Sequence, residues 1–443
     1  MSRDRSVENL RALLRIPTIS RLDESQIDRS QFEKFVATLE RLYPQAHARL
    51  EREIVAGHSL LFRWAGRAAD NPVVLMAHYD VVAATDQGWE HLPFAADLVG
   101  EGDDQVIWGR GTLDDKGSLA ALCEALESAL ADGIVPTHDV YFAFGHDEET
   151  HGTGAQAIAA LLGERGIRPL MVLDEGGAIV RDAFPSVTAP TAAIGVSEKG
   201  PTLIGLVVQQ RGGHASTPPK LTATVRLARA IVRINRRPFR AGFPEPIGWM
   251  FDALGPHATG LVGWAMRSRR IMSPLLLWVL SRGSDETRAL TRTTQAVTML
   301  EAGHAANALA ERATATLNVR VAVGSSVEAA VKHLRRAIRD DAVDVRVISR
   351  GEPAPVSPIT GQAWAMVSSA VQSTFESTVV TPYVQTGATD SRHFTEIASA
   401  IYRFVPFEMT REERDTLHAK NERIHVVSYL RGIDFYRALL NAL

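Results

Sequence analysis

The segment HDVYFAFGHDEET, residues 138–150, runs from an apolar stretch directly into three consecutive acids. Residues 140–145 (VYFAFG) are typical of a strand that is buried on both faces, and Asp147, Glu148 and Glu149 follow its end. Unpaired carboxylates are costly to bury. The segment therefore predicts a buried strand whose end lies beside a compensating cation.

The sequence on both sides of this segment alternates between strands and helices. Strands are predicted in NPVVLMAHYDVV (71–82), QVIWGRG (105–111) and PLMVLDEGG (169–177), and a helix in KGSLAALCEALESALADG (116–133). This is the α/β layout. Such sheets bind ligands beyond the carboxyl ends of their strands.

The pattern changes near Lys199. RATATLNVRVAV (312–323) alternates as a half-buried antiparallel strand does, VEAAVKHLRRAIRD (327–340) predicts an amphipathic helix, and prolines follow from Pro353. We therefore expect a catalytic domain in two parts, 1–198 and 354–443, interrupted by a smaller α+β domain at 199–353. The inserted domain carries an extra apolar segment at about 240–295, and the strand at 201–208 is a candidate edge for pairing between subunits.

Composition excludes several classes of protein. The 443 residues have a net charge of −3, so the composition does not indicate a protein that binds nucleic acid. Cys123 is the only cysteine, which suits a reducing compartment, and residues 1–20 lack the apolar core of a secretory signal. From these two features we expect a cytoplasmic protein. The apolar run at 271–280 is too short to span a bilayer, so we expect no membrane span.

Polar residues gather at the predicted carboxyl ends of the strands, where they meet in one crevice. They are His78, Asp80, Asp114, Asp115, Glu148, Glu149 and Asp174. Imidazole and carboxylate without thiolate suit zinc or a similar divalent ion. His78 and Asp80 share one face of a strand, so one can bind metal while the other orients the imidazole. Glu148 and Glu149 point in different directions, so one can be a ligand and the other a general base.

Seven motifs resemble the di-zinc metallopeptidase superfamily that contains aminoacylase-1, carboxypeptidase S and succinyl-diaminopimelate desuccinylase. They are MAHYDVV (76–82), GRGTLDDKG (109–117), DEETHGTGA (147–155), LDEGG (173–177), RGGHAS (211–216), TGATDSRHF (386–394) and LHAKNERI (417–424). The carboxypeptidase S and N-acyl-amino-acid hydrolase branch is the most similar. The resemblance implies a phosphorylase/hydrolase-like catalytic domain with a mixed central sheet, and an inserted lid or dimerisation domain.

The resemblance also implies a role for each matching residue. The implied metal ligands are His78, Asp114, Glu149, Asp174 and His418, with Asp114 bridging two zinc ions and a cis peptide bond before Asp115. Glu148 is the implied general base and Asp80 orients His78. His214 stabilises the tetrahedral intermediate, in dimeric members from the neighbouring subunit. Asn307 and Arg392 match substrate-binding residues, although Ala308 stands where the family usually has proline.

These roles imply a hydrolase that cleaves an amide or peptide bond next to a free carboxylate. A water between two zinc ions, or other divalent ions such as Co or Mn, is activated by Glu148. We expect a small-molecule or peptide substrate, a homodimer and no nucleic acid. One alternative is an N-acyl-amino-acid synthase/hydrolase whose 240–295 segment selects long apolar acyl chains. An alternative of another class is a non-catalytic metal- or ligand-binding protein.

Overall fold

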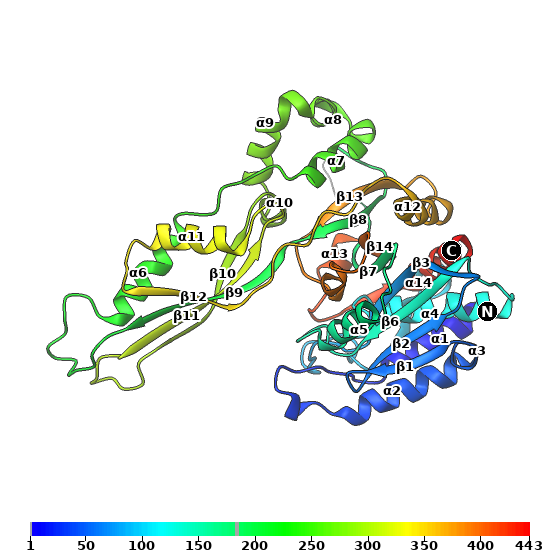
Figure 1. Cartoon of the computed structure of the whole chain (residues 1–443), viewed down its shortest axis with the longest axis horizontal. Coiled ribbons are helices and arrows are strands. Elements are labelled where there is room, and N and C mark those ends of the chain that lie inside the picture. Colours follow the sequence, from blue (N-terminus) through cyan, green and yellow to red (C-terminus); the bar gives the residue numbers. More distant parts are fainter. Residues whose placement is uncertain (1, 182–185) are drawn as a thin grey trace.

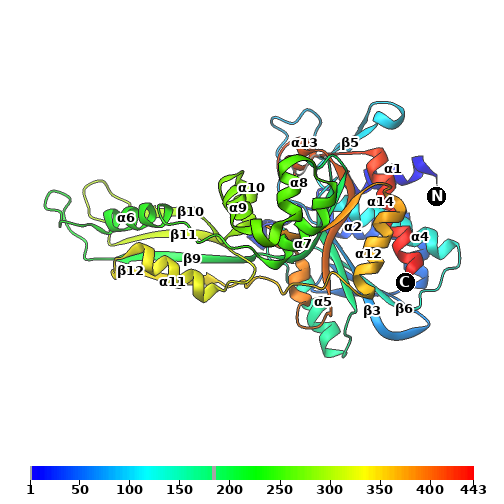
Figure 2. The ribbon, with the colours of Figure 1, turned by 90° about the horizontal axis from the view of Figure 1, so that it is seen from above.

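The computed structural model describes residues 2–181 and 186–443. A main body built on a large sheet carries an elongated arm built on a second sheet (Figures 1 and 2). The chain leaves the large sheet after β8 (Thr191–Glu198) and returns to it at β13 (Val379–Gln385). The mixed α/β fold with an inserted α+β unit is confirmed. The boundaries at 198/199 and 353/354 stay a prediction.

Among the described residues, eight strands form the large sheet in the order β1-β2-β6-β3-β7-β14-β8-β13. The central strands β6, β3, β7 and β14 run parallel to one another. At one side of the sheet, β2 runs antiparallel to β6, and β1 runs antiparallel to β2. The sheet is therefore mixed, as predicted. Its other strands are β1 (Glu51–Val55), β2 (Ser59–Trp64), β3 (Ala68–His78), β6 (His138–Gly145), β7 (Met171–Val180) and β14 (Ile401–Met409).

Helices cover both faces of this sheet, which explains the continuous apolar runs of its strands. Along β3, Val73 and Leu75 belong to the larger core, while Val74 and Met76 pack in a second core with α5 (Thr153–Glu164). The larger core is closed by α1 (Arg3–Leu14), α2 (Arg29–Leu42), α3 (Pro44–Arg49), α4 (Lys116–Ala131), α12 (Gln362–Thr374) and α14 (Val426–Ala442).

The arm contains a four-stranded sheet in the order β10-β11-β9-β12, with α6 (Ala223–Asn235) and α11 (Val327–Ile338) packed on it. The strands are β9 (Gly200–Gln209), β10 (Thr294–Ala302), β11 (Arg312–Val321) and β12 (Val343–Ser349). The expectation that 201–208 forms an edge is wrong, because β9 pairs with β11 on one side and β12 on the other. The edge strands are β10, where Met299 and Leu300 face solvent, and β12, where Ile348 does.

The extra apolar segment forms four helices between the arm and the body: α7 (Glu245–Leu254), α8 (Gly260–Arg267), α9 (Arg269–Arg282) and α10 (Asp285–Thr291). Its buried residues do not join the core of the arm. They cluster with Val379 and Val384 of β13, the edge strand of the large sheet. The segment is therefore partly a local core that caps this edge.

A small sheet supports the loops near the functional residues. It consists of β4 (Asp97–Val99), β5 (Val106–Trp108) and β15 (Arg423–His425), in the order β15-β5-β4, and α13 (Arg411–Arg414) precedes β15. Pairing of β15 with β5 brings the C-terminal segment against the loop that follows β5. Over the described residues, helices are too short or too polar to cross a bilayer.

Candidate metal centre and its surroundings

Parallel pairing brings the functional segments together at the carboxyl ends of the central strands of the large sheet. His78, the last residue of β3, lies level with Gly145, the last residue of β6, so the acids after β6 lie beside the His78 ring. β7 pairs with the other side of β3 and carries Asp174 and Glu175. The predicted convergence of strand ends is therefore present in the structure.

Asp114 lies between two histidines that are far apart in the sequence. One carboxylate oxygen lies 2.9 Å from Nε2 of His78, and the other lies 2.8 Å from Nε2 of His418. His418 Nε2 is also 3.1 Å from a carboxylate oxygen of Glu149. A carboxylate with one imidazole at each oxygen has the arrangement that a bridge between two metal ions requires. The Asp114–Asp115 peptide bond is cis, as the resemblance implies.

Two groups of side chains among the described residues bring their potential ligand atoms within 4.8 Å of one another. One group is His78, Asp114 and Glu149, and the other is His78, Glu148 and Glu175. Nitrogen and oxygen donors without thiolate fit zinc and related divalent ions. Glu149 Oε1 is buried and accepts no hydrogen bond from the protein, so it is free to act as a metal ligand.

Asp174 does not belong to either group. Its Oδ2 accepts a hydrogen bond from the backbone amide of Ser391 at 2.8 Å, and the next residue, Glu175, belongs to the second group instead. The pairing of β14 with β7 explains the difference: Arg403 faces Asp174 but Phe404 faces Gly177, so Glu175 forms part of a bulge. Bulges next to functional sites redirect side chains. The sequence signal was present, because adjacent residues of a strand point to opposite faces.

Asp80 organises both the histidine and the acidic loop. Its Oδ1 lies 3.3 Å from Nδ1 of His78, and its two oxygens accept hydrogen bonds from the backbone amides of Glu148 and Glu149, each at 3.1 Å. Asp147 has a different role, because its carboxylate accepts the amides of Thr153 and Gly154 at the start of α5. The three consecutive acids thus divide into one helix cap and two carboxylates at the cluster.

Glu422 is a residue that sequence reasoning did not single out, although it lies in the LHAKNERI motif. One of its carboxylate oxygens accepts the amides of Gly111, Leu113 and Asp114 at 3.0, 2.9 and 3.3 Å. The other oxygen pairs with Arg110. Glu422 and Arg110 are both buried. This carboxylate therefore anchors the Asp114 loop to the segment that carries His418.

The cluster concentrates negative charge. Burial raises the pKa of Glu148 well above its usual range, opposed by His78 and reinforced by Asp390 and Glu149. Burial likewise raises the pKa of Glu175. The neighbouring carboxylates of Asp114 and Glu149 raise the pKa of His418 to about 10. Excess carboxylate at a buried site is the electrostatic environment that a bound cation would neutralise.

The predicted substrate-binding residues fall into two places. Arg392, in the 3-10 helix η4 (Asp390–Phe394), donates to the Thr389 carbonyl at 2.9 Å and lies beside Gly152 in the acidic loop. A second arginine, Arg320 of β11, is close enough to Glu148 and Arg392 for their charges to affect its pKa, which burial lowers. Sequence reasoning did not single out Arg320, which lies near the end of the alternating strand β11, opposite Pro201 at the start of β9.

His214 and Asn307 lie together, but not at the cluster. The Ala215 amide donates to the Asn307 carbonyl at 3.1 Å, and His214 pairs with Ala308 as an isolated bridge. Both residues are exposed, in loops at the outer end of the arm (Figures 1 and 2). The structure brings the two together and leaves them away from the metal cluster of their own chain.

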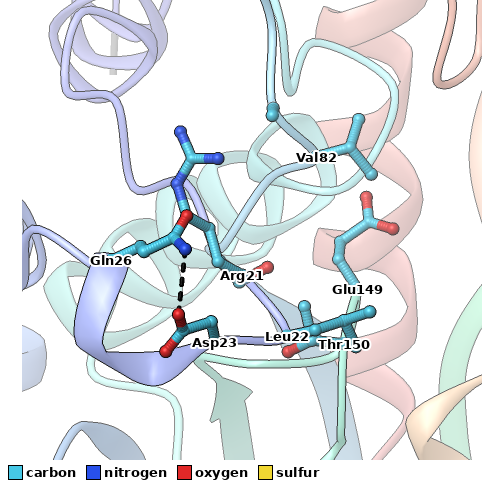
Figure 3. Close-up of a pocket in the computed structure, with 9 residues that line it drawn as sticks. Arg21, Leu22, Asp23, Gln26, Val82, Glu149 and Thr150 are labelled. Carbon is cyan, nitrogen blue, oxygen red and sulfur yellow. Dashed lines mark hydrogen bonds between the residues drawn. The ribbon is translucent and has the colours of Figure 1, made fainter.

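A pocket of about 400 Å³ opens beside Glu149 (Figure 3). The N-terminal loop forms one wall, and the segment after β3 and the acidic loop form the others. The lining residues are Ser20, Arg21, Leu22, Asp23, Gln26, Val82, Ala83, Glu149 and Thr150. No residue of the 240–295 segment lines this pocket, so it is distinct from the acyl-selecting wall expected from the sequence.

Comparison with known proteins adds to this geometry. Residues 74–442 match the model of peptidase family M20/M25/M40. A probable carboxypeptidase S-like 2 of Dictyostelium discoideum is 35% identical over 431 residues, which cover 96% of this chain and 82% of that protein. The human N-fatty-acyl-amino acid synthase/hydrolase PM20D1 is 34% identical over 98% of this chain and 86% of its own. The M20 metallo-carboxypeptidase Sso-CP2 of Sulfolobus solfataricus has the same fold, with a TM-score of 0.71 and 17% identity over 98% of each chain.

Proposed function

Because this chain belongs to the M20/M25/M40 peptidase family and is a metal-dependent hydrolase, we propose that it cleaves an amide or peptide bond next to a free carboxylate. The observation that carries this proposal is Asp114 between His78 and His418, with Glu148 close to His78. The alternative of a non-catalytic binding protein is set aside, since the family is enzymatic.

We propose that two divalent ions, zinc in the first place, occupy this cluster. The proposed ligands are His78, Asp114, Glu149, Glu175 and His418, with Glu175 in place of Asp174. Bound ions of this kind polarise the carbonyl under attack and make water a stronger nucleophile at neutral pH. Asp80 holds the His78 ring and the backbone of the acidic loop in register, so the ligands are oriented in advance.

Glu148 acts as the general base and acid. It takes a proton from the attacking water and later delivers this proton to the nitrogen of the leaving amine, which returns Glu148 to its starting state. The backbone hydrogen bond from Glu148 to Asp80 fixes its position.

Two arginines support recognition of the substrate carboxylate. Arg392 lies at the acidic loop, and Arg320 reaches the same region from the arm. A guanidinium holds a carboxylate through two parallel hydrogen bonds, which would orient the bond to be cleaved. We propose that His214 and Asn307 reach the site of a partner subunit in a homodimer, because both lie at the outer end of the arm.

A second candidate function is hydrolysis or synthesis of N-acyl amino acids with long acyl chains. It is favoured by the human relative named N-fatty-acyl-amino acid synthase/hydrolase and by Leu22, Val82 and Ala83 in the pocket beside Glu149. A rise in kcat/KM from N-acetyl to N-lauroyl forms of one amino acid is the expected result. A flat or falling series would leave short acyl groups and dipeptides as the substrates.

The single cysteine supports a cytoplasmic location.

The test of the main proposal is hydrolysis of dipeptides and N-acyl amino acids by metal-replete protein, compared with the Glu148→Gln variant. We expect the variant to lose at least about 10²–10⁴-fold in kcat, because the base is lost. Its metal content should stay unchanged, because Glu148 is not among the proposed ligands. Near-wild-type activity in the variant would show that another residue is the base.

A further inference from the structure

The helical hairpin formed by α8 and α9 exposes large apolar side chains. Leu261 and Ile271 are 85% and 84% exposed, and Trp264 and Trp278 are each 53% exposed. The complete set, which we call the hairpin patch, is Leu261, Val262, Trp264, Ile271, Leu275, Trp278 and Val279. Single exposed apolar residues are ordinary on protein surfaces, whereas seven within one hairpin mark an interaction surface.

The exposed residues of α9 share one face of the helix. Ile271, Leu275, Trp278 and Val279 follow the helical period of four, seven and eight residues, and Arg282 continues the same row. A different face packs inward, where Leu276 is buried in the core that includes β13. The exposed face is therefore additional to the one that holds the hairpin on the body. An ordinary surface helix would be polar there.

The charged side chains of α8 and α9 are all arginines, and the acids Asp285 and Glu286 of the neighbouring α10 are paired with Arg288 and Arg414. Between Asp252 and Asp285 the sequence contains Arg267, Arg269, Arg270 and Arg282 and no Asp or Glu. Arg269 pairs with Asp252, whereas Arg270 and Arg282 are exposed beside the apolar face. The Arg282 guanidinium lies 4.7 Å from the centre of the Trp278 ring.

We propose that the hairpin patch docks the protein peripherally on a lipid membrane with negatively charged headgroups. Apolar side chains with tryptophan at their border insert to the level of the headgroups, and arginines beside them bind the anionic surface. A second copy of this chain fits the patch less well, because two such patches would bring arginines of the same sign together. The proposal is independent of the substrate of the hydrolase.

The test is co-sedimentation of the full chain with phosphatidylcholine vesicles, with and without phosphatidylserine. We expect binding that requires phosphatidylserine and weakens with added salt. Reversing Arg270 and Arg282 together (R270E with R282E) should weaken binding by at least roughly twentyfold, since each arginine near such a surface contributes about fivefold. The matched control is R236E with R240E, which changes the same charge at exposed positions outside the patch.

A second variant tests the apolar part. I271S with W278S should lose membrane binding, whereas I54S with L92S, which removes apolar side chains exposed at 59% and 55% elsewhere, should bind as the wild type does. Hydrolysis of a soluble substrate by each variant verifies that it is folded. The proposal is overturned if the wild type does not bind anionic vesicles, or if the patch variants bind as tightly as their controls. It is also overturned if the patch variants dissociate an oligomer that forms without lipid, because the patch would then join two copies.

Discussion

Glu422 joins the Asp114 loop to the C-terminal segment, and its removal is expected to destabilise both the fold and the metal centre. Glu422→Ala leaves the buried Arg110 without its partner, which costs about 3–5 kcal/mol. It also leaves the amides of Gly111 and Leu113 without an acceptor, at about 1–3 kcal/mol each if no water replaces it. Because these terms do not simply add, we expect a loss of at least about 4 kcal/mol, a large part of a typical stability of about 5–15 kcal/mol.

Glu422→Gln separates the two contributions. The Gln side chain keeps one oxygen for the loop amides but presents an amide group to Arg110, so the ion pair alone is lost. In the double variant with Arg110→Met no buried charge is left unpaired, and we expect it to recover at least about 2 kcal/mol relative to Glu422→Gln. Asp114 is the neighbour that the loop holds in place, so metal affinity should fall about 10–100-fold in Glu422→Gln.

The assay is urea unfolding of the wild type and the three variants at one pH, with metal affinity measured by competition with a chelator. The reasoning would be refuted if Glu422→Ala changed the free energy of unfolding by less than about 1 kcal/mol, which is the size of an ordinary surface effect. It would also be refuted if the double variant were no more stable than Glu422→Gln. Unchanged metal affinity in a destabilised variant would limit Glu422 to a structural role.

Three further predictions concern the metal cluster, the buried Lys199 and the arm. Glu175→Ala should lower bound metal by about one ion per chain while Asp174→Asn keeps both, as measured by metal analysis; the reverse result would return Asp174 to the ligand set. Burial lowers the pKa of Lys199 to about 7, against about 10.4 in an unfolded chain. Between these values the unfolded state binds more protons, so stability should rise with pH by up to about 1.4 kcal/mol per unit, and urea unfolding of Lys199→Met should show a flatter dependence. Mixing His214→Ala with Glu148→Ala subunits should restore activity if His214 acts in the partner's site; no recovery after verified subunit exchange would contradict that arrangement.

Local patterns were sufficient for the main architecture. The apolar runs around His78 and Glu148 predicted strands covered on both faces, because a strand between two helical layers has no solvent-facing side. The change of period after Lys199 predicted the separate arm. The positions of His78, Asp114, Glu149 and His418 followed from motifs and strand ends, and the structure brings all four together. Their roles as ligands stay a prediction that metal analysis can test.

Only the tertiary structure decided features that depend on contacts between distant segments. The bulge between β7 and β14 places Glu175, rather than Asp174, in a group with His78 and Glu148, and strand order places β9 inside its sheet rather than at the edge. The anchor between Glu422 and the Asp114 loop joins residues about three hundred positions apart. The period of a sequence reports which face of an element is apolar, but not which partner covers that face. Strand pairing and long-range side-chain contacts determine that partner, and so they place the bridging carboxylate, its anchor and the exposed hairpin.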